Sequence, residues 1–121
     1  MYNILIIEDH KDFRQAVSQY LRIKKVKANL LEAATGKEGV ELATLNRPEI
    51  VLMDFCLSGL NGAGAAAQIK ANVPECSIIL LSTFDLQDAQ PFINREIIRA
   101  LISKSDLCEK LIPHINTILC S

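Results

Sequence analysis

Three carboxylates stand where two short apolar runs of the sequence end. Glu8 and Asp9 follow the run at residues 3–7, and Asp54 closes the run at residues 50–54. Short apolar runs are typical of buried strands, where a carboxylate is costly unless something pairs with it. Two unit charges ~4 Å apart interact by roughly 4 kcal/mol at an effective dielectric constant of 20. If the two strands are neighbours, the acids therefore need a cation, and oxygen ligands suit Mg²⁺ with waters and a phosphate.

Two further polar side chains follow later apolar runs. Ser82 ends the run at residues 77–82, and Lys104 comes directly after the run at residues 100–103. An ammonium beside three carboxylates can hold an oxygen of a phosphoryl group. The pattern therefore indicates phosphate chemistry, with an aspartate as the candidate nucleophile.

The elements that must position these residues alternate along the chain. Strands are predicted at residues 3–7, 28–33, 50–54, 77–82 and 100–103, with helices at 13–21, 36–46, 62–72, 85–97 and after 106. Such alternation favours a parallel sheet covered on both faces. We expect an α/β, flavodoxin-like (βα)5 fold, a doubly wound parallel five-stranded sheet with strand order 2-1-3-4-5. In that order, ligands bind beyond the carboxyl ends of the first and third strands.

Local signals set the details of the last helix. Asp106 and Glu109 have the spacing of a capping box at its start. Pro113 lies inside it and is expected to kink the helix or to shorten its regular part.

Composition limits the class of protein. At 121 residues, the chain is expected to be a single domain, 1–121. Its net charge of −1, with acids and bases mixed, gives no footprint for nucleic acid or for an anionic membrane. No apolar run approaches the ~20 residues of a membrane span, and the N-terminus lacks signal-peptide features. A cytoplasmic location is therefore expected.

Other interpretations of these residues remain open. Asp9, Asp54 or Ser82 could be only a helix cap, and Lys104 could be an ordinary surface lysine. A nucleotide-binding domain is a further alternative, because Gly62, Gly64 and Ala67 spell the G-x-G-x-x-A fingerprint and Asp85 lies about 20 residues on. That alternative leaves a long connection between the strand and the helix, and it gives Glu8, Asp9 and Lys104 no purpose.

Four stretches carry a family resemblance: ILIIEDHKDFRQAV, IVLMDFCLSGLNG, IILLSTFD and ALISKSDL. In this order they resemble the receiver domain of bacterial two-component response regulators, and most of all the receivers of LuxR-type DNA-binding regulators. The resemblance covers essentially the whole chain. It implies that Asp54 accepts a phosphoryl group from a sensor histidine kinase or phosphotransfer protein. It also implies Mg²⁺ held by Glu8, Asp9, Asp54 and the Cys56 backbone carbonyl, with Ser82 and Lys104 contacting the phosphoryl group.

The same resemblance implies a switch rather than an enzyme with a turnover substrate. Phosphorylation would change the face formed by the helix at 85–97, the last strand and the last helix. An output domain or target protein, and a homodimer, are the further partners it suggests, without direct nucleic-acid or membrane binding by this domain.

Three positions depart from the family pattern. Ser58 stands where a proline is usual, Leu101 replaces an aromatic residue that reports the switch, and Ser105 follows the lysine where a cis proline is common. Phosphoryl acceptance needs none of these residues. They leave open a pseudo-receiver, which would act as a phosphorylation-independent protein-interaction module.

Overall fold

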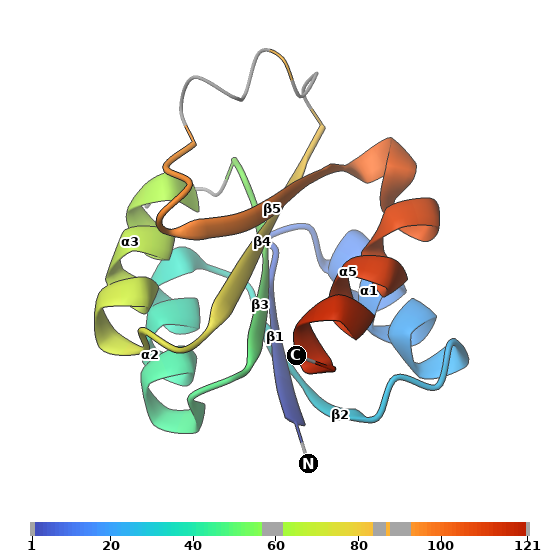
Figure 1. Ribbon diagram of the computed structural model, residues 1–121, viewed down its shortest axis with the longest axis horizontal. Helices are drawn as coiled ribbons and strands as arrows, with labels where there is room; N and C mark the ends of the chain where they lie inside the picture. Colours follow the sequence, from blue (N-terminus) through green and yellow to red (C-terminus); the bar gives the residue numbers. More distant parts are fainter. Residues whose placement is uncertain (1, 57–61, 84–86, 88–92, 121) are drawn as a thin grey trace.

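The chain folds into a parallel sheet between two layers of helices, as the computed structural model shows for residues 2–56, 62–83, 87 and 93–120 (Figure 1). The strands are β1 (Tyr2–Ile7), β2 (Ala28–Ala33), β3 (Ile50–Asp54), β4 (Ser77–Ser82) and β5 (Ile98–Ser103). All neighbours pair in parallel, in the order β2-β1-β3-β4-β5. The predicted flavodoxin-like fold is confirmed.

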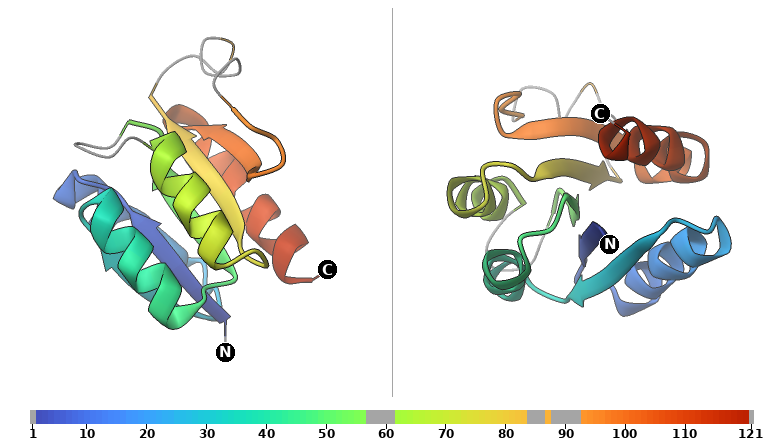
Figure 2. Two further views of the ribbon diagram at one scale, coloured as in Figure 1. Left: turned by 90° about the vertical axis from the view of Figure 1, so that its left-hand side faces the viewer. Right: turned by 60° about the horizontal axis from the view of Figure 1, so that its bottom comes forward.

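Helices cover both faces of the sheet. α1 (Lys11–Ile23) and α5 (Leu107–Leu119) lie on one face, and α2 (Gly36–Asn46) and α3 (Gly62–Asn72) lie on the other (Figures 1 and 2). None of the helices in the described parts of the chain is both long and apolar enough to cross a membrane.

The two helical layers explain why the strands are continuous apolar runs. In β1, Ile4 and Ile6 pack in the core with α1 and α5, whereas Leu5 and Ile7 pack in the core with α2 and α3. Side chains of a strand alternate between its two faces, so a strand buried on both faces needs apolar residues at every position. β3 is buried along its whole length, including Asp54.

The predicted helix at residues 85–97 is wrong for its last part. Residues 84–86 and 88–92 lie outside the described structure, and residues 93–97 form an irregular segment and a turn. The side chain of Asn94 accepts a hydrogen bond from the Glu96 backbone N–H at 2.9 Å. Asparagine side chains compete with the helix for backbone groups in this way.

The start of α5 also differs from the prediction. A short 3-10 turn, η2 (Lys104–Asp106), precedes the helix, and the Ser103 side chain caps it by accepting from the Ser105 N–H. Asp106 makes no capping hydrogen bond, so the predicted capping box is absent. α5 continues through Pro113 to Leu119, so its regular part is not shortened. Pro113 is exposed, where water can bind the carbonyl that the proline leaves unpaired.

α2 approaches β1 closely at Gly39, immediately behind the acidic end of β1. A Cβ atom built on Gly39 would overlap Ile7 Cδ1 and lie 2.8 Å from Ile7 Cγ1. Ile7 is fully buried and directly precedes Glu8. The absence of a side chain at Gly39 therefore allows the helix to pack against the strand that presents the first two carboxylates.

Gly39→Ala should lower the free energy of unfolding by about 1–2 kcal/mol, because overpacking of the core outweighs the helix propensity of alanine, worth ~1 kcal/mol. Urea denaturation measures the change. Adding Ile7→Val, which removes Cδ1, should make the double variant more stable than the sum of the two single changes predicts. An unchanged free energy of unfolding in Gly39→Ala would contradict this expectation and show that the overlap with Ile7 relaxes without cost.

Candidate functional site

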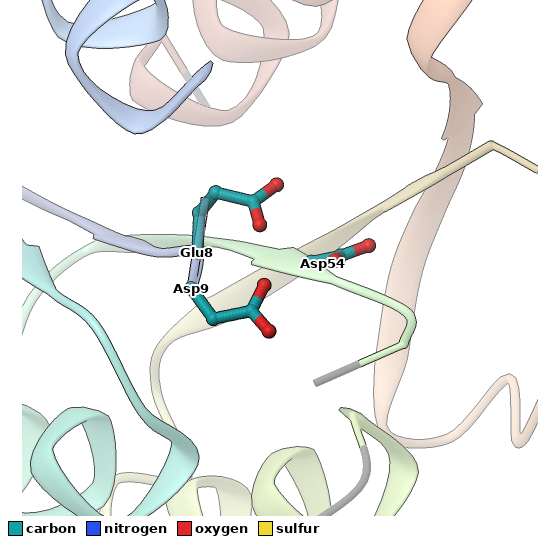
Figure 3. Close-up of side chains that lie close together, drawn as sticks. All are labelled: Glu8, Asp9 and Asp54. Carbon is teal, nitrogen blue, oxygen red and sulfur yellow. The ribbon is translucent and has the colours of Figure 1, made fainter. Parts of the chain in front are cut away.

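Three carboxylates converge at one edge of the sheet. Glu8 and Asp9 follow β1, Asp54 ends β3, and the two strands are paired up to Ile7 and Met53. One oxygen from each carboxylate lies within 4.8 Å of the others, and all three side chains extend toward the same side of the strand ends (Figure 3). The structure thus brings together the three acids that the sequence predicted to meet.

Backbone hydrogen bonds fix the carboxyl ends of these strands. The Glu8 N–H donates to the Ala33 carbonyl at 3.0 Å, and the Phe55 N–H donates to the Leu81 carbonyl at 2.8 Å. Asp54 Oδ1 accepts from the Cys56 N–H at 3.3 Å. The sheet ladder therefore continues to the site, which limits how far the acids can separate.

Helix capping does not account for Asp9 or Asp54. α1 begins at Lys11 and its N-cap position is His10. α3 begins at Gly62, well after Asp54. The same long connection removes the tight strand-to-helix turn that a dinucleotide fingerprint requires; Asp85 lies outside the described residues.

The site buries negative charge. Glu8 is 2% exposed and Asp54 is 7% exposed, whereas Asp9 faces solvent. Burial raises the pKa of the Glu8 carboxyl above its usual value, although a hydrogen bond from Lys104 opposes the rise. Desolvation of this kind disfavours the charged form of a carboxyl group, so the cluster gains from any cation that reaches it.

Lys104 supplies one positive charge. Its Nζ lies 2.7 Å from Glu8 Oε1 and 3.5 Å from Asp54 Oδ1. Its side chain is only 16% exposed, so it is not an ordinary surface lysine. The ammonium lies closer to Glu8 than to Asp54, and one charge cannot balance three carboxylates.

Ser82 and Cys56 were also predicted at this site. Ser82 is the last residue of β4 and is fully buried, one position beyond the residue that pairs with Asp54. Cys56 is exposed and lies two residues after Asp54, with its N–H directed at that carboxylate. Their contacts with a phosphoryl group and a metal ion stay predictions.

Arg14 is a residue of the site that the sequence interpretation missed. Its Nη1 donates to the Glu8 backbone carbonyl at 2.8 Å, while its Nε pairs with Glu32 Oε1 at 3.1 Å. Arg14 thereby ties the end of β1 to β2. The sequence signal for this role is a cation one turn into a helix that directly follows two acids.

Comparison with known proteins identifies the family. The family model described as the response regulator receiver domain matches residues 4–115. The chain belongs to this family. The response regulator protein VraR of Staphylococcus aureus is 31% identical over 98 residues, which are 81% of this chain and 44% of VraR. The receiver domain therefore spans less than half the length of the curated relatives it matches.

Solved structures show the same fold. The receiver domain of the sensor histidine kinase PA1611 from Pseudomonas aeruginosa superposes with a TM-score of 0.87 at 24% identity, over 99% of this chain and 98% of that one. That protein holds a magnesium ion in its active-site cleft. A LuxR-family DNA-binding response regulator from Staphylococcus aureus matches with a TM-score of 0.82 at 21% identity, over 98% of each chain.

Asp9→Asn should raise the free energy of unfolding in EDTA by about 0.5–1 kcal/mol, because it removes one of three mutually repelling charges. With Mg²⁺ added, the wild-type protein should become the more stable of the two, because the ion stabilises the wild type more than the variant. Thermal or urea unfolding with and without MgCl₂ measures both effects. Asp12→Asn, which removes an exposed acid from the first turn of α1, is the matched control. An equal response to Mg²⁺ in wild type and Asp9→Asn would exclude Asp9 from the metal site.

Proposed function

We propose that this receiver domain is a phosphoacceptor and that Asp54 takes the phosphoryl group. The observation that carries the proposal is the position of Asp54 at the buried end of the central strand. Two further carboxylates lie within 4.8 Å of it, and the Lys104 ammonium is 3.5 Å away. The sensor histidine kinase or phosphotransfer protein expected from the sequence would be the donor.

The acidic cluster fits a magnesium ion. Carboxylate oxygens from Glu8, Asp9 and Asp54, with the Cys56 backbone carbonyl, form the hard-oxygen donor set that Mg²⁺ prefers, with positions left for water and a phosphate oxygen. The bound ion would offset the repulsion between these acids and an incoming phosphoryl group. The mutual proximity of the carboxylates supports this site, since it leaves them with a surplus of negative charge.

In the proposed transfer, Asp54 is the nucleophile, and Lys104 and Ser82 stabilise the group that is transferred. An oxygen of the Asp54 carboxylate attacks phosphorus in line, and the bond between phosphorus and the donor atom breaks as the new bond forms. The product is an acyl phosphate, and the donor leaves with the electron pair. The Lys104 ammonium and the Ser82 hydroxyl stabilise the phosphoryl oxygens, whose negative charge would otherwise meet that of Glu8.

The output of this reaction is a shift between two conformations. The acyl phosphate adds about 1.5–2 negative charges beside buried carboxylates, and Ser82 moves toward it. We expect this movement to reach the chain after Ser82 and the face that the family resemblance assigns to the helix expected there, β5 and α5. The domain acts as a switch with slow self-dephosphorylation. A cytoplasmic location, an output domain or target protein, and a homodimer complete the proposal for residues 1–121 as one receiver domain.

Treatment with acetyl phosphate and Mg²⁺ should add one phosphoryl mass to the protein, and Asp54→Asn should abolish the addition because an amide is not a nucleophile. Intact-mass spectrometry measures the product. Asp106→Asn, which changes a half-buried acid paired with Lys110, should label like the wild type. Equal labelling of wild type and Asp54→Asn would contradict the assignment, and no labelling of any variant would favour the phosphorylation-independent pseudo-receiver.

Ser82→Ala should blunt the NMR shifts that beryllofluoride induces in residues 83–100, because the buried hydroxyl is the proposed link to the phosphoryl group. Leu101→Ala should leave those shifts in place and keep the phosphorylation rate within a few-fold. Leu101 is half-buried against the core shared with α2 and α3, and leucine has no hydroxyl that could bond differently in two states. Loss of the distant shifts in Leu101→Ala, with Ser82→Ala unaffected, would show that the switch runs through Leu101.

A further inference from the structure

Lys104 has to reach across the end of the sheet to contact the acids. It follows β5, an edge strand, whereas Glu8 follows β1, and β3 and β4 lie between them. Its ammonium is nevertheless held 2.7 Å from Glu8 Oε1. A lysine side chain has many rotamers, and fixing one of them costs conformational entropy. Contacts along its path must therefore restrict it.

The ring of Phe13 provides such a contact. Phe13 lies in the first turn of α1, and Lys104 Nζ is placed over its ring, 4.4 Å from the centroid. An ammonium within about 6 Å of a ring face is attracted by the quadrupole of the ring. The ring itself is half-buried against the core cluster that contains Val17 and Leu21, so the platform is fixed by packing.

The ring differs in kind from the other partners of Lys104. The carboxylate oxygens of Glu8 and Asp54 that contact Lys104 are also the ones that a metal ion and a phosphoryl group would bind. The aromatic ring of Phe13 binds neither of these groups. When the carboxylates bind a metal ion or a phosphoryl group in place of Lys104, the contact between the Lys104 ammonium and the Phe13 ring can persist.

We propose that Phe13 is a positioning residue for phosphoryl transfer. Its ring holds the Lys104 ammonium at the site while the carboxylate partners of that ammonium are exchanged. The role in transfer rests on the proposed phosphoacceptor function, whereas the contact between ring and ammonium can be tested without it.

The first measurement is NMR of the Lys104 side chain. Protons above a ring face are shifted upfield, so the ε-methylene protons of Lys104, assigned by their loss in Lys104→Arg, should be shifted in the metal-free protein and with Mg²⁺ and beryllofluoride. The shift should persist in Phe13→Tyr, which keeps the ring, and vanish in Phe13→Leu. Tyr20→Leu is the matched control: it removes a second ring of α1, which lies 5.8 Å from Lys24 Nζ, and should leave Lys104 unchanged.

The second measurement is the phosphorylation rate with acetyl phosphate at saturating Mg²⁺. Phe13→Leu should lower the maximal rate by about two- to thirty-fold, the range that a cation–π contact supports, without raising the half-saturating Mg²⁺ concentration. Phe13→Tyr should restore the rate, and Tyr20→Leu should match the wild type. An unshifted Lys104 in the wild-type protein, a shift that survives in Phe13→Leu, or equal slowing in Phe13→Tyr and Phe13→Leu would overturn the proposal. A wild-type protein that takes no phosphoryl group would defeat the proposed function, and the NMR comparison would still decide whether the ring holds the ammonium.

Discussion

Negative charge buried at the end of a parallel sheet is the constraint on which the site depends. Glu8 and Asp54 are almost inaccessible to water, and Asp9 completes a cluster whose oxygens lie within 4.8 Å of one another. Such a group is unfavourable unless cations offset it. The Lys104 ammonium meets part of that need. The remaining surplus is what makes the edge receptive to a metal ion, and it is also what a new phosphoryl group would increase.

A rigid fold holds these repelling charges together. β1 and β3 are held in register by ladder bonds that continue to the site, and helices pack both faces with apolar side chains. Arg14 adds a further hydrogen bond at the end of β1, which it donates to the Glu8 carbonyl. The acids cannot relieve their repulsion by moving apart without breaking the central strands. Electrostatic strain is therefore stored at one edge while the core supplies the stability.

The sequence predicted the parts of the structure that depend on periodicity and on the geometry of parallel sheets. Apolar runs located the strands. Because the carboxyl ends of parallel strands lie at one edge of the sheet, Glu8, Asp54 and Lys104 could be predicted to meet there. Local competition between hydrogen bonds was harder to foresee. Asn94 bonds its own turn instead of a helix, and Ser103 starts a 3-10 turn before Asp106 can cap α5. Arg14 acts through a backbone carbonyl, an acceptor that every residue has and that no sequence pattern marks.

The contact between Lys104 and Glu8 joins residues 96 positions apart, so it closes most of the chain into one loop. Loops of this length form late, because closing them costs entropy that only a largely assembled sheet can offset. A chain that has just left the ribosome, or one that has lost its last strand to proteolysis, has Asp54 but not the ammonium beside it. The proposed phosphoryl transfer, which uses this ammonium, would therefore require the completed fold, and a damaged or unfinished copy of the domain would not accept the phosphoryl group.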